Sequence, residues 1–177
     1  MILSVIRKRR SIRKYLQKSI EPEKRDALIE AALRAPSSRG INPWEFIIVD
    51  NPDLLNRLSS SKQYGSSFLK EASLAIVICA DARRSDVWVE DSAIAATYIQ
   101  LTAESIGIGS CWIQIRERMH DNDQTAENFI QEVLGIPEQL KVDSLIALGY
   151  PRETPMPHEK DKLQYQKVSY NRYGSPK

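Results

Sequence analysis

A basic cluster near the N-terminus contains the residues best suited to chemistry: Arg9, Arg10, Ser11, Ile12, Arg13 and Lys14. Arg9 and Arg13 are four residues apart, so in a helical turn they would lie on one face. Planar guanidinium groups match phosphate oxygens, and with the Ser11 hydroxyl between them they predict a site for a phosphate monoester. Two other interpretations stay open here. The cluster also fits a solvated or nucleic-acid-binding face, and the first nineteen residues contain no acid, as in a transit peptide.

A second polar stretch, the loop at residues 35–44, contains Pro36, Ser37, Ser38 and Asn42. It joins the end of an expected helix to an expected buried strand and is dense in hydrogen-bonding groups. Asn42 offers an amide donor and acceptor, the pairing that a flavin pyrimidine edge or a nucleobase requires. Taken alone, Asn42 followed by proline is better explained as a turn. Only together with the basic cluster does this polar loop favour a ligand site.

The composition excludes several classes of protein. The chain has 177 residues and a net charge of +2, which suits one domain with a real core and argues against a general nucleic-acid binder. Cys79 and Cys111 lie far apart in apolar surroundings, as expected for reduced thiols in a cytoplasmic protein. Neither has a metal-ligand spacing with His120 or His158, so we expect no metal site and no histidine-based triad. No uncharged run is long enough to span a bilayer.

The pattern of apolar residues predicts a single α+β domain over residues 1–177. Strands and helices alternate without a regular βαβ rhythm, so we expect a central mixed or antiparallel sheet flanked by helices. Gly107-Ile108-Gly109 ends a helix instead of opening one, so it is not a dinucleotide fingerprint. The apolar run 74–80 should be the central strand. The expected helices are 2–9, 22–35, 52–61, 87–108 and 125–134, with a short turn at 66–71, and the expected strands are 44–49, 74–80, 110–115 and 142–148.

The long helix and the C-terminal tail both indicate a surface outside the single chain. Apolar or small residues lie on most sides of the helix at 87–108, so it should be buried nearly all round, which suggests a subunit interface. After Pro151 the chain is polar and aromatic, with too little apolar surface to form a second domain. The tail should therefore be either disordered or wrapped on another surface.

Four segments, in this order, resemble the FMN-dependent nitroreductase family. The first is the basic cluster, and the second runs from Ala35 to Phe46 through the polar loop. The third, after the long helix, reads Gly-Ile-Gly-Ser-Cys-Trp-Ile at 107–113. The last reads Ala-Leu-Gly-Tyr-Pro at 147–151 and is followed by Tyr-Asn-Arg-Tyr at 170–173. Each segment alone is weak, but the set covers nearly the whole chain and is specific.

The resemblance implies a nitroreductase-like fold and a homodimer with two FMN sites at the subunit interface, where each tail embraces the other subunit. The basic cluster would hold the phosphate, the ribityl chain and the pyrimidine side of the flavin. The polar loop would reach across from the partner subunit, and 109–112 would offer backbone amides along the ring. One of two tail lysines would complete the phosphate site. The candidate cofactor-binding residues are Arg9, Arg10, Ser11, Arg13, Pro36, Ser37, Ser38, Asn42, Gly109, Ser110, Cys111, Trp112, Lys160 and Lys162.

This chain departs from the family pattern at two places. Many relatives have an asparagine in the polar loop where this chain has Gly40, which affects the expected ring contacts. Many also have an arginine in the tail where this chain has lysine, a point charge without the bidentate fork. Phosphate binding survives the second change.

The implied activity is an FMN-dependent oxidoreductase in which NAD(P)H reduces the flavin, leaves, and is replaced by a small electron-poor acceptor such as a nitro compound or a quinone. The flavin carries the chemistry, so no catalytic side chain is expected, and Cys111 should be a packed thiol. Two alternatives stay open. One is a specialised reaction on the same fold, such as flavin fragmentation or reductive dehalogenation. The other is a non-catalytic dimer that binds FMN or a nucleotide.

Overall fold

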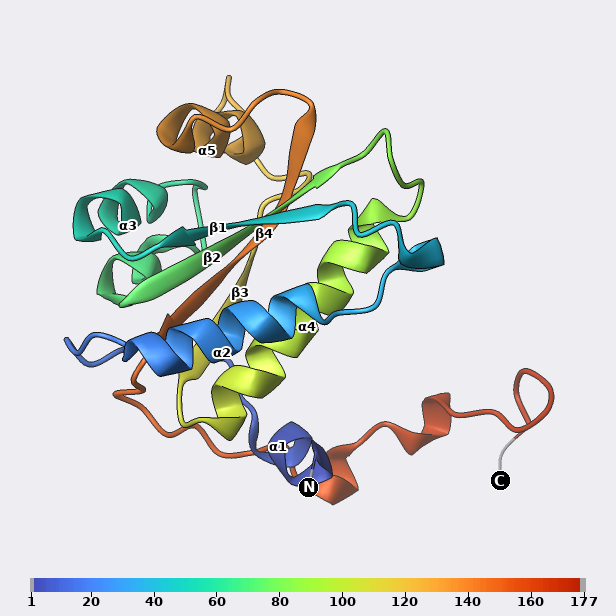
Figure 1. Ribbon diagram of the computed structural model, residues 1–177. Coiled ribbons are helices and arrows are strands. Elements are labelled where there is room, and N and C mark those ends of the chain that lie inside the picture. The colour runs from blue at the N-terminus through green and yellow to red at the C-terminus, as the bar shows by residue number, and fades with distance from the viewer. Residues whose placement is uncertain (1, 176–177) are drawn as a thin grey trace.

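A four-stranded antiparallel sheet forms the centre of the computed structural model, which describes residues 2–175 (Figure 1). In chain order the elements are α1 (Ile2–Lys8), α2 (Pro22–Leu33), η1 (Ser38–Gly40), β1 (Trp44–Val49), α3 (Pro52–Leu58), η2 (Ser67–Glu71), β2 (Leu74–Asp81), α4 (Trp88–Ser105), β3 (Gly109–Gln114), α5 (Ala126–Leu134), β4 (Leu140–Gly149), η3 (Lys160–Lys162) and η4 (Tyr165–Lys167). The spatial order of the strands is β1-β2-β4-β3. The predicted α+β architecture is therefore confirmed, with β2 as an inner strand.

Helices cover both faces of this sheet (Figure 1). Helices α2 and α4 pack on one face, and α3, η2 and α5 cover the other. Successive residues of a strand point to opposite faces, so alternate residues of β2 enter two different cores. Leu74, Ile76 and Ile78 pack against α2 and α4, whereas the residues between them point the other way. Burial on both faces explains why β2 is apolar over nearly its whole length.

Most predicted boundaries agree with the structure. The strand at 44–49 has the expected bounds, and the other elements differ by one to three residues at an end. Pro22 opens α2, and Asn51 caps α3 by accepting the N–H groups of Asp53 and Leu54. The largest differences, of three residues, are at the end of α3, which stops at Leu58, and at the end of α4, which stops at Ser105. There Gly107 turns the chain with a φ of 76°, a conformation that glycine adopts at low cost.

Two glycines on neighbouring strands form a flat floor for the N-terminal segment. Gly109 of β3 lies opposite Gly149 of β4. A β-carbon at Gly149 would lie 2.8 Å from Tyr15 Cδ1, and one at Gly109 would lie 3.0 Å from Ile12 Cβ. Tyr15 is fully buried, and its hydroxyl donates a hydrogen bond to the Ile12 carbonyl at 2.6 Å. The absence of side chains on this glycine floor therefore lets Ile12 and Tyr15 lie directly on the sheet.

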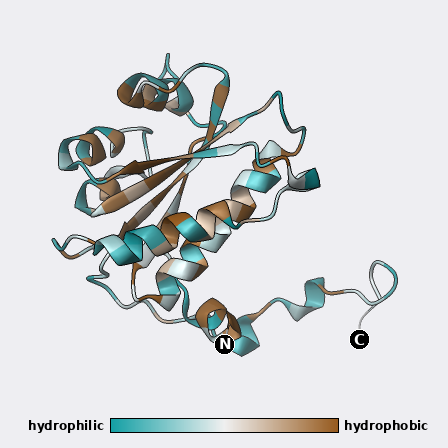
Figure 2. Ribbon diagram, viewed as in Figure 1, coloured by the Kyte–Doolittle hydropathy of each residue, from teal (hydrophilic) through white to brown (hydrophobic). Residues whose placement is uncertain are grey.

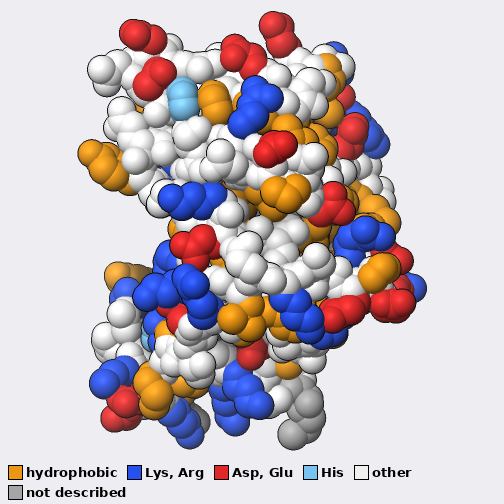
Figure 3. Space-filling view, turned by 90° about the vertical axis from the view of Figure 1, so that its left-hand side faces the viewer, with side chains coloured by type: hydrophobic (Ala, Val, Ile, Leu, Met, Phe, Trp, Pro, Cys, Tyr) orange, Lys and Arg blue, Asp and Glu red, His pale blue; other side chains and the backbone are white. Residues whose placement is uncertain are grey.

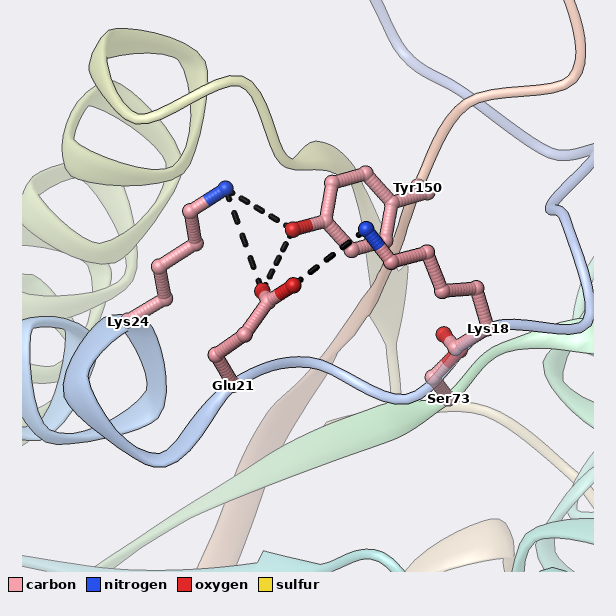
Figure 4. A network of polar contacts seen from close by, with 5 residues as sticks. All are labelled: Lys18, Glu21, Lys24, Ser73 and Tyr150. Atoms are coloured by element: carbon pink, nitrogen blue, oxygen red, sulfur yellow. Dashed lines mark hydrogen bonds and ion pairs between the residues drawn. The ribbon is translucent and has the colours of Figure 1, made fainter.

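A polar network joins the start of α2 to the end of β4 (Figure 4). The Tyr150 hydroxyl donates to the Glu21 carboxylate, and Lys24 Nζ donates to the Tyr150 hydroxyl at 2.8 Å. Lys18 Nζ lies 3.2 Å from Glu21 Oε1 and 3.9 Å from the centre of the Tyr150 ring. Ser73 Oγ donates to the Lys18 carbonyl at 2.6 Å. The hydrogen bond from Tyr150 is the largest of the causes that lower the pKa of Glu21 to about 2.

Replacing Tyr150 with phenylalanine should raise the pKa of Glu21 from about 2 toward its ordinary value of 4.5, because the ionised carboxylate loses its strongest hydrogen bond. A carboxylate with a lowered pKa stabilises the folded protein above pH 4.5, and that contribution disappears as the pH falls toward 2. The Tyr150→Phe variant should therefore lose this contribution to folding stability at a higher pH than the wild type does. NMR titration of the Glu21 carboxyl carbon measures the change, with Tyr165→Phe in the exposed tail as the control. An unshifted Glu21 pKa in the Tyr150 variant would contradict this assignment.

The side of α4 that points away from the sheet is apolar and exposed. Ile94 is 38% and Tyr98 is 41% exposed, so the predicted burial nearly all round is not achieved within one chain. Helix α1 presents exposed apolar residues as well, among them Leu3 and Ile6 (Figure 2). Ile2 of α1 and Tyr98 of α4 line one hollow of about 400 Å³ between the two helices. We call these exposed apolar side chains of α1 and α4 the α1–α4 face. It is uncovered because the described part of the chain has no further element that packs on it.

After β4 the tail runs past α1 and then extends away from the body of the molecule to one side (Figure 1). Its apolar and aromatic side chains are exposed, among them Leu163, Tyr165 and Tyr170. None of the helices in the described part of the chain has the length and apolar character needed to span a bilayer.

Candidate functional site

The basic cluster is extended, so the predicted helical turn that would place Arg9 and Arg13 on one face is wrong. Helix α1 ends before the cluster, and Ser11 then forms a parallel bridge with Ser110 of β3. Ile12 is held on the glycine floor, and its N–H donates to the Ser110 carbonyl at 2.9 Å. Arg9, Ser11 and Arg13 nonetheless all lie close to Cys111 of β3, since each of them acts on its thiol.

The thiol of Cys111 shows which side chains this arrangement brings together. Burial raises the pKa of Cys111, and four neighbours oppose that effect: the charge of Arg13, a hydrogen bond with Ser11, and the charges of Arg9 and Lys62. Because burial has the larger effect, the thiol stays protonated at neutral pH, unlike a nucleophilic cysteine. The three cations thus lie near enough to Cys111 for their charges to act on its thiol, and the Ser11 hydroxyl lies within hydrogen-bond reach of it.

Lys62 is a cation of this group that the sequence analysis did not identify. It lies in the loop between α3 and η2, and its pKa is lowered by burial and then by the positive charge of Arg118. His120 holds this loop, because its Nδ1 lies 2.8 Å from the Ser60 carbonyl while its ring stacks on Phe129 of α5. No local motif marks Lys62. Only the packing of the loop against the segment before α5 places it beside β3.

A hollow in the surface lies at one edge of the molecule, between the end that carries α3 and α5 and the end that carries α1 (Figure 3). Lysine and arginine side chains gather on both sides of it in this view. A hollow with cations on two sides suits an anionic ligand, since field lines from both walls converge in it. Among residues 2–175 there is no cluster of three or more histidines, cysteines or acids that could hold a metal ion.

Two predicted site residues point away from this group. Arg10 lines a separate cavity of about 180 Å³ with Glu104 and the residues that follow α4. Trp112 packs with the α2 and α4 core, and its indole N–H donates to Gln114 Oε1 at 3.0 Å. Side chains alternate along β3, so Trp112 and Cys111 face opposite sides of the sheet. Only the Trp112 backbone, on the outer edge of β3, remains for a ligand on the Cys111 side.

The polar loop is located at the other end of α4. Ser37 Oγ donates to Asn42 Oδ1 at 2.6 Å and accepts the Asn42 N–H at 2.9 Å, which closes the loop on itself. The Ser38 N–H donates to Asp91 in the first turn of α4 at 2.8 Å. Pro36 and Asn42 are exposed. Helix α4 has 18 residues and is about 27 Å long, so one chain does not bring the polar loop to the basic cluster.

The two tail lysines, Lys160 and Lys162, lie in the exposed turn η3, and Lys162 Nζ is 2.6 Å from Glu159 Oε2. The start of the tail, in contrast, contacts the cluster directly. Glu153 Oε1 accepts the backbone N–H of Arg13 at 2.6 Å, which fixes the backbone from which the Arg13 side chain projects.

Comparisons with known proteins agree with this geometry. The model of the Nitroreductase family matches residues 6–63 and 59–150. The FMN-dependent nitroreductase of Clostridium difficile R20291 is 46% identical, with a TM-score of 0.95 over 97% of this chain and 99% of that one. A "Putative NADH dehydrogenase/NAD(P)H nitroreductase" of Archaeoglobus fulgidus is 37% identical over 163 residues, 90% of either chain. The solved structure of a similarly named protein of Parabacteroides distasonis is 32% identical, with a TM-score of 0.88 over 97% of this chain and 98% of that one.

These matches extend over almost all of the chain, and the four segments that carried the resemblance lie within or next to them. The fold has the same architecture as these structures, from the antiparallel sheet to the long helix α4. The resemblance inferred from the sequence is therefore confirmed, and this chain belongs to the nitroreductase family.

Proposed function

We propose that this protein is an FMN-dependent oxidoreductase that uses NAD(P)H to reduce nitro compounds, quinones or other electron-poor acceptors in two separate half-reactions. The observation that carries the proposal is the convergence of Arg9, Ser11, Arg13 and Lys62 around the start of β3. The names of its relatives, an FMN-dependent nitroreductase and an NAD(P)H nitroreductase, support the cofactor and the reductant.

The donors at this site fit a flavin mononucleotide. Guanidinium groups and a hydroxyl suit its phosphate and its polar ribityl chain. The Trp112 N–H, on the edge of β3 whose Ser110 carbonyl accepts from Ile12, would serve as a backbone donor to the ring. An aromatic surface is also present, since the ring of Phe68 lies 5.8 Å from the Arg13 guanidinium carbon. The site thus combines anion binding with a flat apolar wall, as a planar phosphorylated cofactor requires.

The remaining donors would come from a second copy of the chain. The apolar α1–α4 face is uncovered in the single chain, and a two-fold dimer would bury it against itself. If two α4 helices pack antiparallel, the first turn of one lies beside the last turn of the other. The polar loop with Pro36, Ser37, Ser38 and Asn42 then reaches the partner's basic cluster. The tail, with Lys160 and Lys162, would extend over the partner in the same way.

When bound, FMN supplies the redox chemistry by accepting hydride from NAD(P)H and passing the electrons to the second substrate. The protein supplies position and charge. Arg9, Ser11 and Arg13 would hold the anionic end of the cofactor, and Lys62 would place a positive charge beside the site, where it would stabilise developing negative charge. Cys111 stays a protonated thiol that packs under Ser11 and transfers no group. One open face would serve reductant and acceptor in turn.

Purified protein should be yellow or take up added FMN, and the flavin absorbance should bleach under NADH or NADPH without oxygen. Adding a nitroaromatic compound or a quinone should restore the absorbance. Protein that stays colourless with excess FMN would contradict the cofactor assignment, and bound flavin that neither nicotinamide reduces would contradict the enzymatic one. Steady-state rates with a panel of acceptors and both nicotinamides then define the substrate range.

A further inference from the structure

We infer that Asp91 is a positioning residue that holds the polar loop in the shape that contacts FMN, an inference that rests on the proposed function. Asp91 is only 2% exposed. Its Oδ1 accepts the Ser38 N–H at 2.8 Å, and its Oδ2 accepts the Ser85 hydroxyl at 3.1 Å. One buried carboxylate therefore ties together the polar loop, the segment before α4 and the first turn of α4.

Two further contacts join the same segments, but both are exposed. Arg39 Nη2 lies 2.6 Å from Asp86 Oδ1, and these side chains are 66% and 80% exposed. Arg84 Nη2 donates to the Ile41 carbonyl at 2.9 Å on the same surface. Water competes for exposed pairs, so they contribute little, whereas removing a buried acceptor leaves its donors unsatisfied. The shape of the loop thus depends on Asp91 far more than on Asp86.

The backbone of the loop shows why it needs an anchor. Arg39, Gly40 and Asn42 all have positive φ, at 54°, 64° and 49°. Residues other than glycine populate this left-handed region sparsely, so the surrounding contacts must select it. The contact from Asp91 is made at Ser38, immediately before this run. Losing it would free the loop to return to ordinary conformations.

The shape that Asp91 fixes determines which donor the loop presents. The Ser37 hydroxyl donates to the side-chain oxygen of Asn42 and accepts its backbone N–H. The side-chain NH₂ of Asn42 has no partner within residues 2–175. Because Asp91 uses the Ser38 N–H, the loop offers its side chains, above all that NH₂ group, to the flavin. Asp91 acts through the loop and does not itself touch the cofactor.

Three variants of the full chain test this role by FMN titration. Asp91→Ala should weaken FMN binding by about tenfold or more, since it removes a buried charged hydrogen bond. Asp91→Asn keeps an oxygen for the Ser38 N–H and an NH₂ for Ser85, so its affinity should stay within about threefold of wild type. Asp86→Ala removes the exposed pair on the same loop and should also stay within about threefold. Rescue by asparagine separates hydrogen-bond positioning from a need for negative charge.

A second pair of variants removes the donor instead of the acceptor and keeps the test valid if Asp91→Ala does not fold. Ser37 has an extended backbone, with φ −132° and ψ 158°, which is compatible with a following proline. Ser38→Pro, which lacks the N–H, should bind FMN about tenfold more weakly than Ser38→Ala, which keeps it. Equal affinities in this pair would overturn the inference, as would wild-type affinity in Asp91→Ala or a full defect in Asp91→Asn. If wild-type protein itself fails to bind FMN, the proposed function fails instead.

Discussion

Replacing Arg13 with alanine should weaken FMN binding by about ten- to a hundredfold, because a guanidinium bonded to an anionic ligand contributes a charge-assisted hydrogen bond. Its side chain acts with Arg9 and Ser11 on the Cys111 thiol of β3, and its backbone is held by Glu153. Fluorescence titration of FMN with the apoprotein measures the affinity. Lys14→Ala is the matched control, since Lys14 is an adjacent exposed cation that does not belong to the group of charges around Cys111.

Wild-type affinity in Arg13→Ala would show that Arg13 is not part of the site. An equal loss of FMN affinity in Lys14→Ala would show that the loss reflects only the change in net charge.

Mixing subunits extends the test to the proposed shared site. A dimer of one Arg13→Ala chain and one Asn42→Ala chain contains one undamaged site if the loop serves its partner, and none if it serves its own chain. Half of the wild-type flavin content in purified mixed dimers would therefore support the composite site, and none would contradict it.

Replacing Gly149 with alanine should lower the free energy of unfolding by about 2–3 kcal/mol, through overpacking. The new β-carbon would lie 2.8 Å from Cδ1 and 3.1 Å from Cγ of Tyr15, which is fully buried and cannot turn away. The segment that carries Arg13 must then lift from the glycine floor, so FMN affinity should fall as well. Urea denaturation of wild type and variant measures the change in stability.

A double-mutant cycle identifies the clash as the cause. Tyr15→Ala is destabilising by itself because it leaves a cavity, but it makes room for the β-carbon at position 149. The double variant should therefore be more stable than the sum of the two single effects, by about 1 kcal/mol or more. Strict additivity would show that Gly149→Ala acts elsewhere, for example through its pairing with Gly109.

Local patterns predicted the elements well because each depends on nearby residues. The strand at 44–49 is apolar between two turns, and β2 is apolar because both of its faces are covered. The prediction of a helical turn at the basic cluster was wrong because this segment depends on residues far away in the sequence. A spacing of four residues suggested a helix, whereas burial of Ile12 and Tyr15 on the glycine floor, more than ninety residues away in sequence, imposes an extended chain.

The same distinction separates the candidate site residues that a motif indicated from those that no motif indicated. Arg9, Ser11 and Arg13 belong to a motif that can be read locally. Lys62 is a single lysine in a serine-rich loop, and only the contact of His120 with Ser60 shows how that loop is held. Asp91 resembles any acid at the start of a helix until its burial and its bond to Ser38 are known. Long-range packing supplies this information, and the sequence contains no local sign of it.

The hydrogen bond from Arg13 to Glu153 joins residues 140 positions apart, and this has a consequence for synthesis on the ribosome. The basic cluster is made early, whereas β3, β4 and the acid that hold it are made more than ninety residues later. Contacts of such long separation form late in folding, after loop closure has been paid for in entropy. A nascent chain therefore carries its cations with no floor beneath them. Cofactor loading is accordingly a step that follows release of nearly the whole chain.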